Sequence, residues 1–357
     1  MKDELNALAE KSEMEYHTSD YILRELNNLS NAKVLEVENS CSLLAIFQTG
    51  RIGKTVLLRA DIDAILFDGD YRHLCGHDGH TAVLLSLAKV IDSVINKMNG
   101  TVILLFQAAE ETGKGAYEVV SSGILKDFTI DYFFAMHNLP GFPLNSVVIS
   151  NGIFAKASSG IKINLIGQTS HAANPANGYP MDYYIINIIN QMHKLAEQLS
   201  TNPNDLLLTL THINFGKPNF GTILNEAVIY GVIRSTRQSD IESYKEILRE
   251  DLSTILSESS IKSYLEFHEE FPVTENSAKC VDIIKEAVRL PIVELSEPFS
   301  WSEDFGHFSK IGDICLFGLG IGENASALHT AGYAYTKECL TTAVETFYFI
   351  LFKTNRI

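Results

Sequence analysis

Apolar runs alternate with segments of helical spacing in the first and last parts of the chain. Four of these runs are continuous and are typical of strands buried on both faces of a parallel sheet. They cover residues 55–58, 101–106, 131–136 and 314–319. Helical spacing follows at 81–98, 116–122 and 337–352. This order predicts an α/β domain with a mixed, mostly parallel sheet.

The middle of the chain has a different pattern. Strands are predicted at 160–166, 206–215, 227–235 and 263–268, and helices at 181–199 and 240–256. Gly216 and Gly221 mark the turn between the central strands, and Ser239 or Asp240 is a candidate cap for the second helix. The order β-α-β-β-α-β is that of a ferredoxin-like unit. We therefore expect an inserted α+β domain at 157–265 within a larger domain formed by 1–156 and 266–357.

Composition narrows the classes of partner. The 357 residues are 46% hydrophobic and 20% charged, which is ordinary for a globular protein. The 44 acidic and 28 basic residues give a net charge of −16, which argues against nucleic acid or an anionic membrane as a general partner. Five cysteines without Cys-x-x-Cys spacing indicate reduced thiols. The acidic start and the absence of a long apolar run then favour a cytoplasmic location.

Polar clusters follow the predicted strands. They lie at 59–63, 107–111 and 137–138, with further clusters in loops at 75–80 and 328–330. Ligands bind outside the carboxyl ends of the strands in open parallel sheets, so we expect these clusters to converge at one sheet edge.

The side chains in these clusters are the ligand types of a divalent transition-metal site. The candidate ligands are Cys75, His77, Glu111, His137 and His329. Five ligands exceed the need of one hydrolytic ion and suit two ions that share the thiolate, about 3.5–4 Å apart. The thiolate favours zinc, with manganese, cobalt or nickel as alternatives.

Glu110 remains outside this ligand set. A buried carboxylate beside a ligand is what a general base for a metal-bound water requires. Alternatively, Cys75 is a thiol nucleophile with His77 as its base, although this leaves the other candidate ligands unexplained. The remaining cysteines, and five histidines, are interpreted as packed or surface residues: Cys41, Cys280, Cys315, Cys339, His17, His73, His193, His212 and His268.

Seven stretches in a fixed order make the chain recognisable. They are 58–64, 75–82, 106–111, 137–140, 170–175, 302–305 and 328–330. With them the chain resembles the two-metal aminoacylase/carboxypeptidase family of amidohydrolases, in its branch of hippurate hydrolases and indole-acetyl-amino-acid hydrolases. The resemblance implies a zinc-exopeptidase-like catalytic domain and an inserted lid through which such proteins form homodimers.

The resemblance also implies residue roles. The five candidate ligands match the family's metal ligands, and Glu110 matches its base. Asp63 matches an acid that orients a ligand. His171 matches a lid histidine that reaches the partner's active site and stabilises the oxyanion.

Substrate recognition departs from the family pattern. Arg234 matches a lid arginine, but Gly221 stands at the position of a carboxylate-binding Asn and Leu224 at that of a Pro. Asn219 or Asn225 is expected to substitute for that Asn. The expected activity is cleavage of the amide of small N-acyl amino acids through a metal-bound water. A dipeptidase, carboxypeptidase or aminopeptidase of the same chemistry and a non-catalytic metal-binding homologue are the alternatives.

Overall fold

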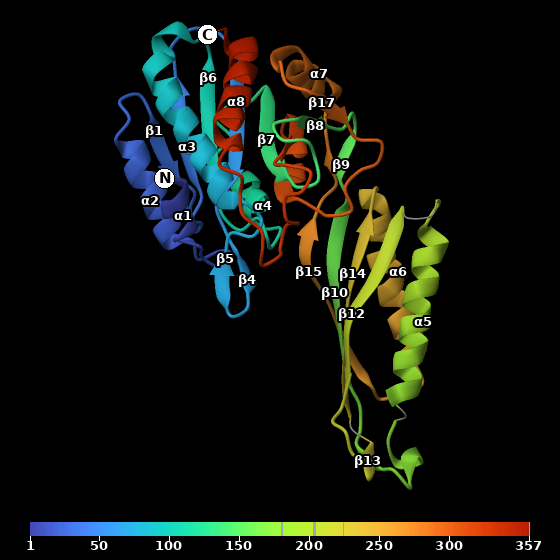
Figure 1. Cartoon of the computed structure of the whole chain (residues 1–357). Helices are drawn as coiled ribbons and strands as arrows, with labels where there is room; N and C mark the ends of the chain where they lie inside the picture. The colour runs from blue at the N-terminus through green and yellow to red at the C-terminus, as the bar shows by residue number, and fades with distance from the viewer. Residues whose placement is uncertain (180, 203–204, 224, 357) are drawn as a thin grey trace. The chain divides into compact units, whose positions relative to one another are not determined.

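The computed structural model describes residues 1–179, 181–202, 205–223 and 225–356, and it divides into two compact units (Figure 1). Unit 1 comprises Met1–Phe154, Thr274–Phe299 and Glu303–Ile357. Unit 2 comprises Ala155–Val273 and Ser300–Ser302. The second boundary lies at Val273 rather than at the expected residue 265, because the last strand of unit 2 continues to Phe271.

Unit 1 is built on an eight-stranded sheet in the order β1-β2-β6-β3-β7-β18-β8-β17. The central strands β6, β3, β7 and β18 are mutually parallel, while β1, β2 and β8 make antiparallel pairs. The mixed, mostly parallel sheet predicted from the apolar runs is thereby confirmed. The strands are β1 Lys33–Glu36, β2 Leu43–Gln48, β3 Thr55–Asp61, β6 Thr101–Gln107, β7 Tyr132–Leu139, β8 Val147–Ile149, β17 Ile292–Glu294 and β18 Asp313–Gly320.

Helices cover both faces of this sheet because its central strands are apolar on both faces. On one face, side chains such as Phe106, Phe134 and Phe317 pack in one core with those of α3 and α8. On the other face, Phe133 stacks on Phe308 of the short helix η3, with ring centroids 5.4 Å apart. The helices are α1 Lys2–Asn6, α2 Tyr16–Asn27, α3 His77–Val94, η1 Ile95–Lys97, α4 Gly115–Ser122, α7 Ala278–Ala287, η3 Asp304–Lys310 and α8 Cys339–Asn355.

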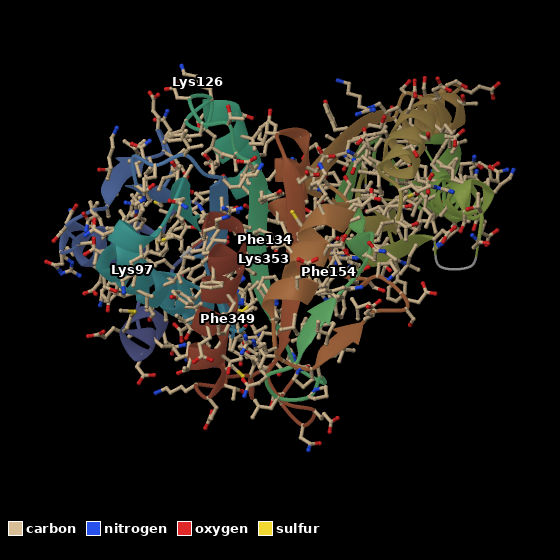
Figure 2. All side chains as sticks on the ribbon, turned by 90° about the horizontal axis from the view of Figure 1, so that it is seen from above. Lys97, Lys126, Phe134, Phe154, Phe349 and Lys353 are labelled. Atoms are coloured by element: carbon tan, nitrogen blue, oxygen red, sulfur yellow. The ribbon has the colours of Figure 1, made fainter. Side chains whose placement is uncertain are left out.

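Apolar and charged side chains take different places in unit 1. Figure 2 shows Phe134 of β7 in the interior of the unit and Lys126 extending outward from its surface. The remaining strands near this core are short. They are the antiparallel pair β4 Ile65–Phe67 and β5 Asp70–Arg72, then β16 Thr274–Glu275 and β9 Ile153–Ala155, whose last residue belongs to unit 2. All five cysteines are free thiols and buried.

Unit 2 has the predicted β-α-β-β-α-β order. Its four-stranded antiparallel sheet runs β12-β14-β10-β15, and α5 and α6 pack on one face (Figure 1). The elements are β10 Ala157–Ile166, β11 Ser170–His171, η2 Pro175–Asn177, α5 Met181–Leu199, β12 Leu206–Phe215, β13 Thr222–Ile223, β14 Glu226–Ser235, α6 Gln238–Leu256 and β15 Lys262–Phe271.

Two local predictions were wrong. The helix expected to begin at residue 81 begins at His77, so part of the polar cluster at 75–80 lies in its first turn. Neither Ser239 nor Asp240 caps α6, because the helix begins at Gln238 after Arg237. Asp240 instead accepts hydrogen bonds from Ser235 Oγ and Arg237 Nε from within the first turn. No helix among the described residues is long and apolar enough to cross a bilayer.

Candidate metal centre

The polar clusters of unit 1 meet at the carboxyl edge of the parallel strands. β3 ends at Asp61, β6 ends at Gln107 just before Glu110 and Glu111, and His137 lies near the end of β7. Their convergence follows from the parallel pairing of β6, β3 and β7, which places these strand ends side by side. The cluster at 137–138 is part of β7, not a loop after it.

Cys75 and His77 approach this edge through a glycine. Gly76 is the residue before α3 and has φ +97°, a left-handed conformation that suits glycine. A Cβ at this position would collide with Asn138 and with the hydroxyl of Tyr333. The turn therefore lets the thiol of Cys75 and the imidazole of His77 face the same space.

His329 is brought in by the loop after β18. Its backbone N–H donates to Leu74 O at 2.8 Å, which ties this loop to the residue before Cys75. His329 has φ +60°, a conformation that costs a residue with a Cβ about 1–3 kcal/mol. The strained residue is the one whose imidazole lies beside Cys75 and Glu111.

The candidate ligands form two groups that share one atom. Cys75 Sγ, His77 and His137 place donor atoms within 4.8 Å of one another, and so do Cys75 Sγ, Glu111 and His329. Cys75 Sγ lies 3.5 Å from His137 Nε2, and His329 Nε2 lies 3.8 Å from Glu111 Oε1. A thiolate common to both groups is the arrangement expected for two ions with a bridging sulfur.

The tautomers of the two buried histidines suit metal binding. His77 Nδ1 faces the carbonyl and a carboxylate oxygen of Asp63 at 3.0 and 3.2 Å, so this nitrogen carries the proton. In His137, Nδ1 lies 2.8 Å from the carbonyl of Asn138, which it donates to. In the neutral form of both rings the lone pair is then on Nε2, and that of His137 lies 3.5 Å from the shared thiol.

Two buried polar atoms show that a cation fits this space. Among the described residues, His77 Nε2 and Glu111 Oε1 have no hydrogen-bond partner. Unpaired buried polar atoms are costly, and both are good ligands for a divalent ion. The donor chemistry and the orphaned atoms agree that the residues present can hold metal.

The electrostatics of the centre favour the protonated forms of its thiol, its carboxylate and His77 as long as no cation is bound. Burial, with the nearby Glu111, raises the pKa of the Cys75 thiol to about 12, and burial raises the pKa of Glu111 to about 7. Burial disfavours charge on His77 as well, but Asp61 and Cys75 outweigh it and raise the pKa of His77 well above its ordinary value. A divalent ion would stabilise the deprotonated thiol and carboxylate.

Asp63 and Glu110 take different places around the ligands. Asp63 Oδ2 accepts from the backbone N–H of Glu111 at 2.9 Å, so this acid orients both His77 and the acidic turn. Glu110 is 6% exposed and its Oε2 lies 3.9 Å from His77 Nε2. Burial, then the neighbouring Glu303 and Glu111, raises the pKa of Glu110 well above its ordinary value.

A buried network beneath the centre was not identified from the sequence. Arg59 is 2% exposed and donates to Asp61 at 2.7 Å, Glu303 at 3.0 Å and Asp304 at 2.8 Å. His80 lies 2.6 Å from both Asp61 Oδ1 and Asn138 Oδ1. The signal was present, because these residues fall in the stretches 58–64, 75–82, 137–140 and 302–305.

The remaining sequence candidates lie on unit 2. His171 Nδ1 accepts from the backbone N–H of Ala173 at 3.0 Å, so Nε2 carries the proton. Arg234 Nη1 donates to Ser302 Oγ at 2.9 Å and to Ser300 O at 3.3 Å. The carboxamide of Asn219 is used locally, because it donates to Lys217 O and accepts from Thr222 N.

Two further positions named in the sequence analysis, Asn225 and Leu224, also belong to this unit. Asn225 is half-buried, and its carbonyl accepts from Gly167 N at 2.7 Å. Leu224, at the position of the family's Pro, lies outside the described residues.

Comparison with known proteins places this site in a family. A model of peptidase family M20/M25/M40 matches residues 57–353, which include all five candidate ligands and both acids. The chain belongs to this family. It is therefore a hydrolase of amide bonds, as the resemblance in its motifs implied.

The relatives found by comparison cover most of the chain. The hippurate hydrolase of Campylobacter jejuni is 26% identical over 327 residues, 87% of this chain and 84% of its own. The N-acetyldiaminopimelate deacetylase of Priestia megaterium is 26% identical over 351 residues, 93% and 91% of the two chains. A dinuclear metal-binding M20 peptidase of Bacillus subtilis has the same fold, with TM-score 0.77, 22% identity and coverage of 98% and 95%.

Metal affinity should rise with pH. Cys75, Glu111 and His77 must lose protons to bind a cation. The pKa values of Cys75 and Glu111 are about 12 and about 7, and that of His77 is raised well above its ordinary value, so binding releases protons. Below pH 7 all three groups release a proton, and above pH 7 the thiol and His77 contribute most of the release. The dissociation constant should fall by about tenfold per pH unit for each proton released.

Competition with a chromophoric chelator at pH 6, 7 and 8 measures this dependence, once the protonation of the chelator is included. Cys75→Ser removes the thiol and should give a shallower slope. An affinity of the wild-type protein that does not change over this range would contradict the assigned ligands.

Proposed function

We propose that this chain hydrolyses the amide bond of small N-acyl amino acids at a two-metal centre held by Cys75, His77, Glu111, His137 and His329. The observation that carries the proposal is the pair of ligand groups sharing Cys75, beside an acid, Glu110, that belongs to neither. The substrate class is supported by the names of the hippurate hydrolase and the N-acetyldiaminopimelate deacetylase.

The metal and protein groups have separate tasks. When bound, two ions polarise the substrate carbonyl and lower the pKa of water at the centre. Zinc is the favoured metal because the shared ligand is a thiolate, with manganese, cobalt or nickel as alternatives.

Glu110 moves the proton. Its buried carboxylate takes a proton from the attacking water and returns it to the leaving nitrogen, which lets the C–N bond break to a carboxylic acid and an amine. Nearby cations would favour its charged form, since they oppose the effect of Glu303 and Glu111 on its pKa. Asp63 holds His77 in the tautomer that presents Nε2.

Residues of unit 2 are proposed to bind substrate. With its proton on Nε2, the exposed His171 can donate to the oxyanion that forms on the carbonyl oxygen. Arg234 is tied to Ser302 through Nη1, and a substrate carboxylate would be held by its remaining N–H groups. Asn225 is the better candidate than Asn219 for the missing Asn, because the amide of Asn219 already supports its own turn.

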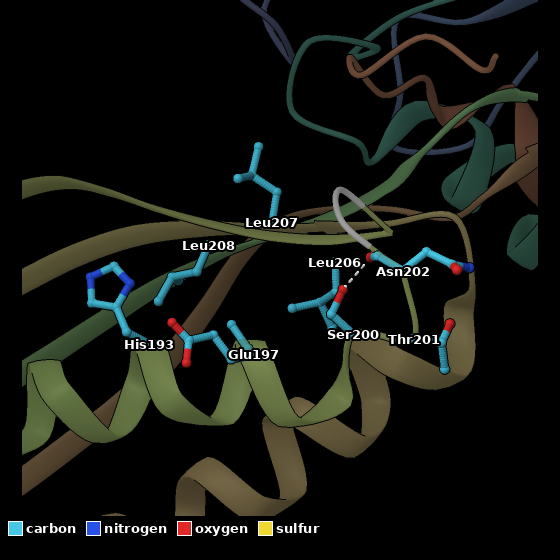
Figure 3. Close-up of a pocket in the computed structure, with 9 residues that line it drawn as sticks. His193, Glu197, Ser200, Thr201, Asn202, Leu206, Leu207 and Leu208 are labelled. Atoms are coloured by element: carbon cyan, nitrogen blue, oxygen red, sulfur yellow. Dashed lines mark hydrogen bonds between the residues drawn. The ribbon is translucent and has the colours of Figure 1, made fainter.

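A homodimer through unit 2 completes the proposal. β12 lies at an edge of its sheet, and its side chains Leu207, Ile213 and Phe215 are exposed. Figure 3 shows a crevice beside this edge, lined by His193 and Glu197 of α5 and by residues of β12. An exposed edge strand is a template for pairing with a second chain. Sedimentation velocity would return the mass of one chain if this assignment is wrong.

Five free thiols support a reducing compartment, the cytoplasm, as the place of action.

A hydrolysis screen tests the substrate class. The metal-free protein is supplied in turn with zinc, manganese, cobalt and nickel, and offered N-acetyl, N-benzoyl and longer N-acyl amino acids beside free dipeptides. N-acyl amino acids should be the better substrates, with the larger kcat/KM. Hydrolysis of dipeptides alone would favour a dipeptidase and contradict the proposed class.

A further inference from the structure

The turn that carries both active-site acids is strained at its first residue. Ala109 has φ +57°, a left-handed conformation in which the Cβ of an L-residue crowds the following carbonyl oxygen. Its carbonyl accepts from the backbone N–H of Gly115 at 3.0 Å and of Lys114 at 3.3 Å. Glu110 and Glu111 follow directly, so the conformation of Ala109 sets the direction in which each of them leaves the strand.

The N–H of Ala109 is held by a residue 94 positions earlier. Glu15, fully buried at the start of α2, accepts this N–H with Oε1 at 2.8 Å. The same oxygen accepts from Glu13 N at 3.1 Å, and the thiol of Cys41 lies beside the carboxyl group. A carboxyl group is costly to bury, so one that accepts the N–H of the strained Ala109 is expected to have a role there.

The segment that contains Glu15 also reaches the other side of the acidic turn. Ser12 Oγ donates to Asp63 Oδ2 at 2.7 Å, and the same oxygen accepts from Glu111 N. Residues 12 and 15 therefore connect to the backbone N–H groups on both sides of Glu110, one directly and one through Asp63.

We propose that Glu15 is a positioning residue, whose carboxyl group holds Ala109 in its left-handed conformation and so directs Glu110 and Glu111 into the metal centre. The proposal rests on the function proposed above and deepens it. Nothing in the motifs of the active site includes Glu15, and its contact with the turn is visible only in three dimensions.

A double-mutant cycle with Ala109→Gly tests this role, because glycine adopts the left-handed conformation without a steric penalty. Glu15→Ala should lower kcat by about 10- to 100-fold with little change in KM, since misplaced catalytic groups cost about this much. Glu15→Gln keeps an oxygen that can accept the N–H and should retain most of kcat. In the Ala109→Gly background, Glu15→Ala should cost clearly less than it does alone.

The same cycle is measured on the metal-free protein by thermal unfolding. Ala109→Gly should raise Tm less in the Glu15→Ala background than in the wild type, because an Ala109 that has relaxed no longer carries the strain that glycine removes. Because this readout needs neither metal nor substrate, it tests the contact even if the proposed substrate class is wrong. Glu13→Gln is the matched control, because Glu13 is an exposed acid of the same segment that pairs with Lys114.

Two results would overturn the proposal: an unchanged kcat in Glu15→Ala, whether or not its Tm falls, or additive effects in both cycles. Failure of Glu110→Gln to reduce turnover would instead overturn the proposed function, so the two failures are distinguishable.

Discussion

Glu110→Gln should lower kcat by about 10³- to 10⁴-fold while the protein keeps its full content of metal. Glutamine has nearly the same shape as glutamate but cannot take up a proton, so the variant loses the general base alone. Glu110 belongs to neither of the ligand groups that share Cys75, although it lies in further groups with His77 and Asp63 and with Glu303 and Asp304. Because glutamine keeps the shape of the side chain and one carbonyl oxygen, metal binding should survive. Steady-state kinetics and elemental analysis of the same preparation measure both quantities.

Glu111→Gln is the matched control, since it changes the neighbouring acid in the same turn. Glu111 belongs to one of the two ligand groups, so this variant should lose about one ion per chain together with its activity. Turnover of Glu110→Gln near the wild-type rate would show that another group activates the water.

Removal of metal should abolish activity, by at least about 10³-fold, and readdition should restore it. In the proposed mechanism the ions would supply both the polarisation of the carbonyl and the lowered pKa of water, so no single residue could replace them. The burial of Cys75 leads to a second expectation, which concerns alkylation of this thiol in the metal-free protein. Because burial raises the pKa of Cys75 to about 12, thiol alkylation of the folded protein should be slow.

Dialysis against a strong chelator, followed by titration with each divalent ion, measures this dependence. Dialysis against buffer alone is the control for inactivation by handling. A cysteine hydrolase that uses Cys75 predicts the opposite, namely indifference to chelator and rapid inactivation by iodoacetamide, and that outcome would rule out the two-metal assignment.

The central strands were predictable because of where they lie. Strands such as β6 are buried on both faces, and an unbroken apolar run is a signal that needs no tertiary information. Strands at the edges of the sheet have shorter or less apolar runs, so this signal is weaker for them. β1 is only partly buried and β17 is three residues long, and neither was predicted. The start of α3 was also missed, because Gly76 offers no capping side chain and His77 begins the helix directly.

The meeting of the candidate ligands could be expected from their chemistry, whereas the network around Arg59 was not identified. Thiol, imidazole and carboxylate groups after buried strands indicate a metal site wherever they meet. Arg59 has no such signature, since a buried arginine is recognised only from its partners. Two of those partners, Glu303 and Asp304, lie 244 and 245 residues away in sequence.

In unit 2 the elements were easier to predict than the boundary of the domain. Alternation of apolar and polar residues predicted its strands and helices, but the outer part of β15 is largely exposed and has weak patterning. The predicted boundary therefore fell inside this strand, eight residues before Val273.

The most direct test of the two-metal centre is anomalous diffraction from crystals of the zinc-loaded protein. We expect two peaks per chain, one within about 2.0–2.3 Å of donor atoms of Cys75, His77 and His137, and the other at the same distance from Cys75, Glu111 and His329. A single peak, or peaks away from Cys75, would contradict the account.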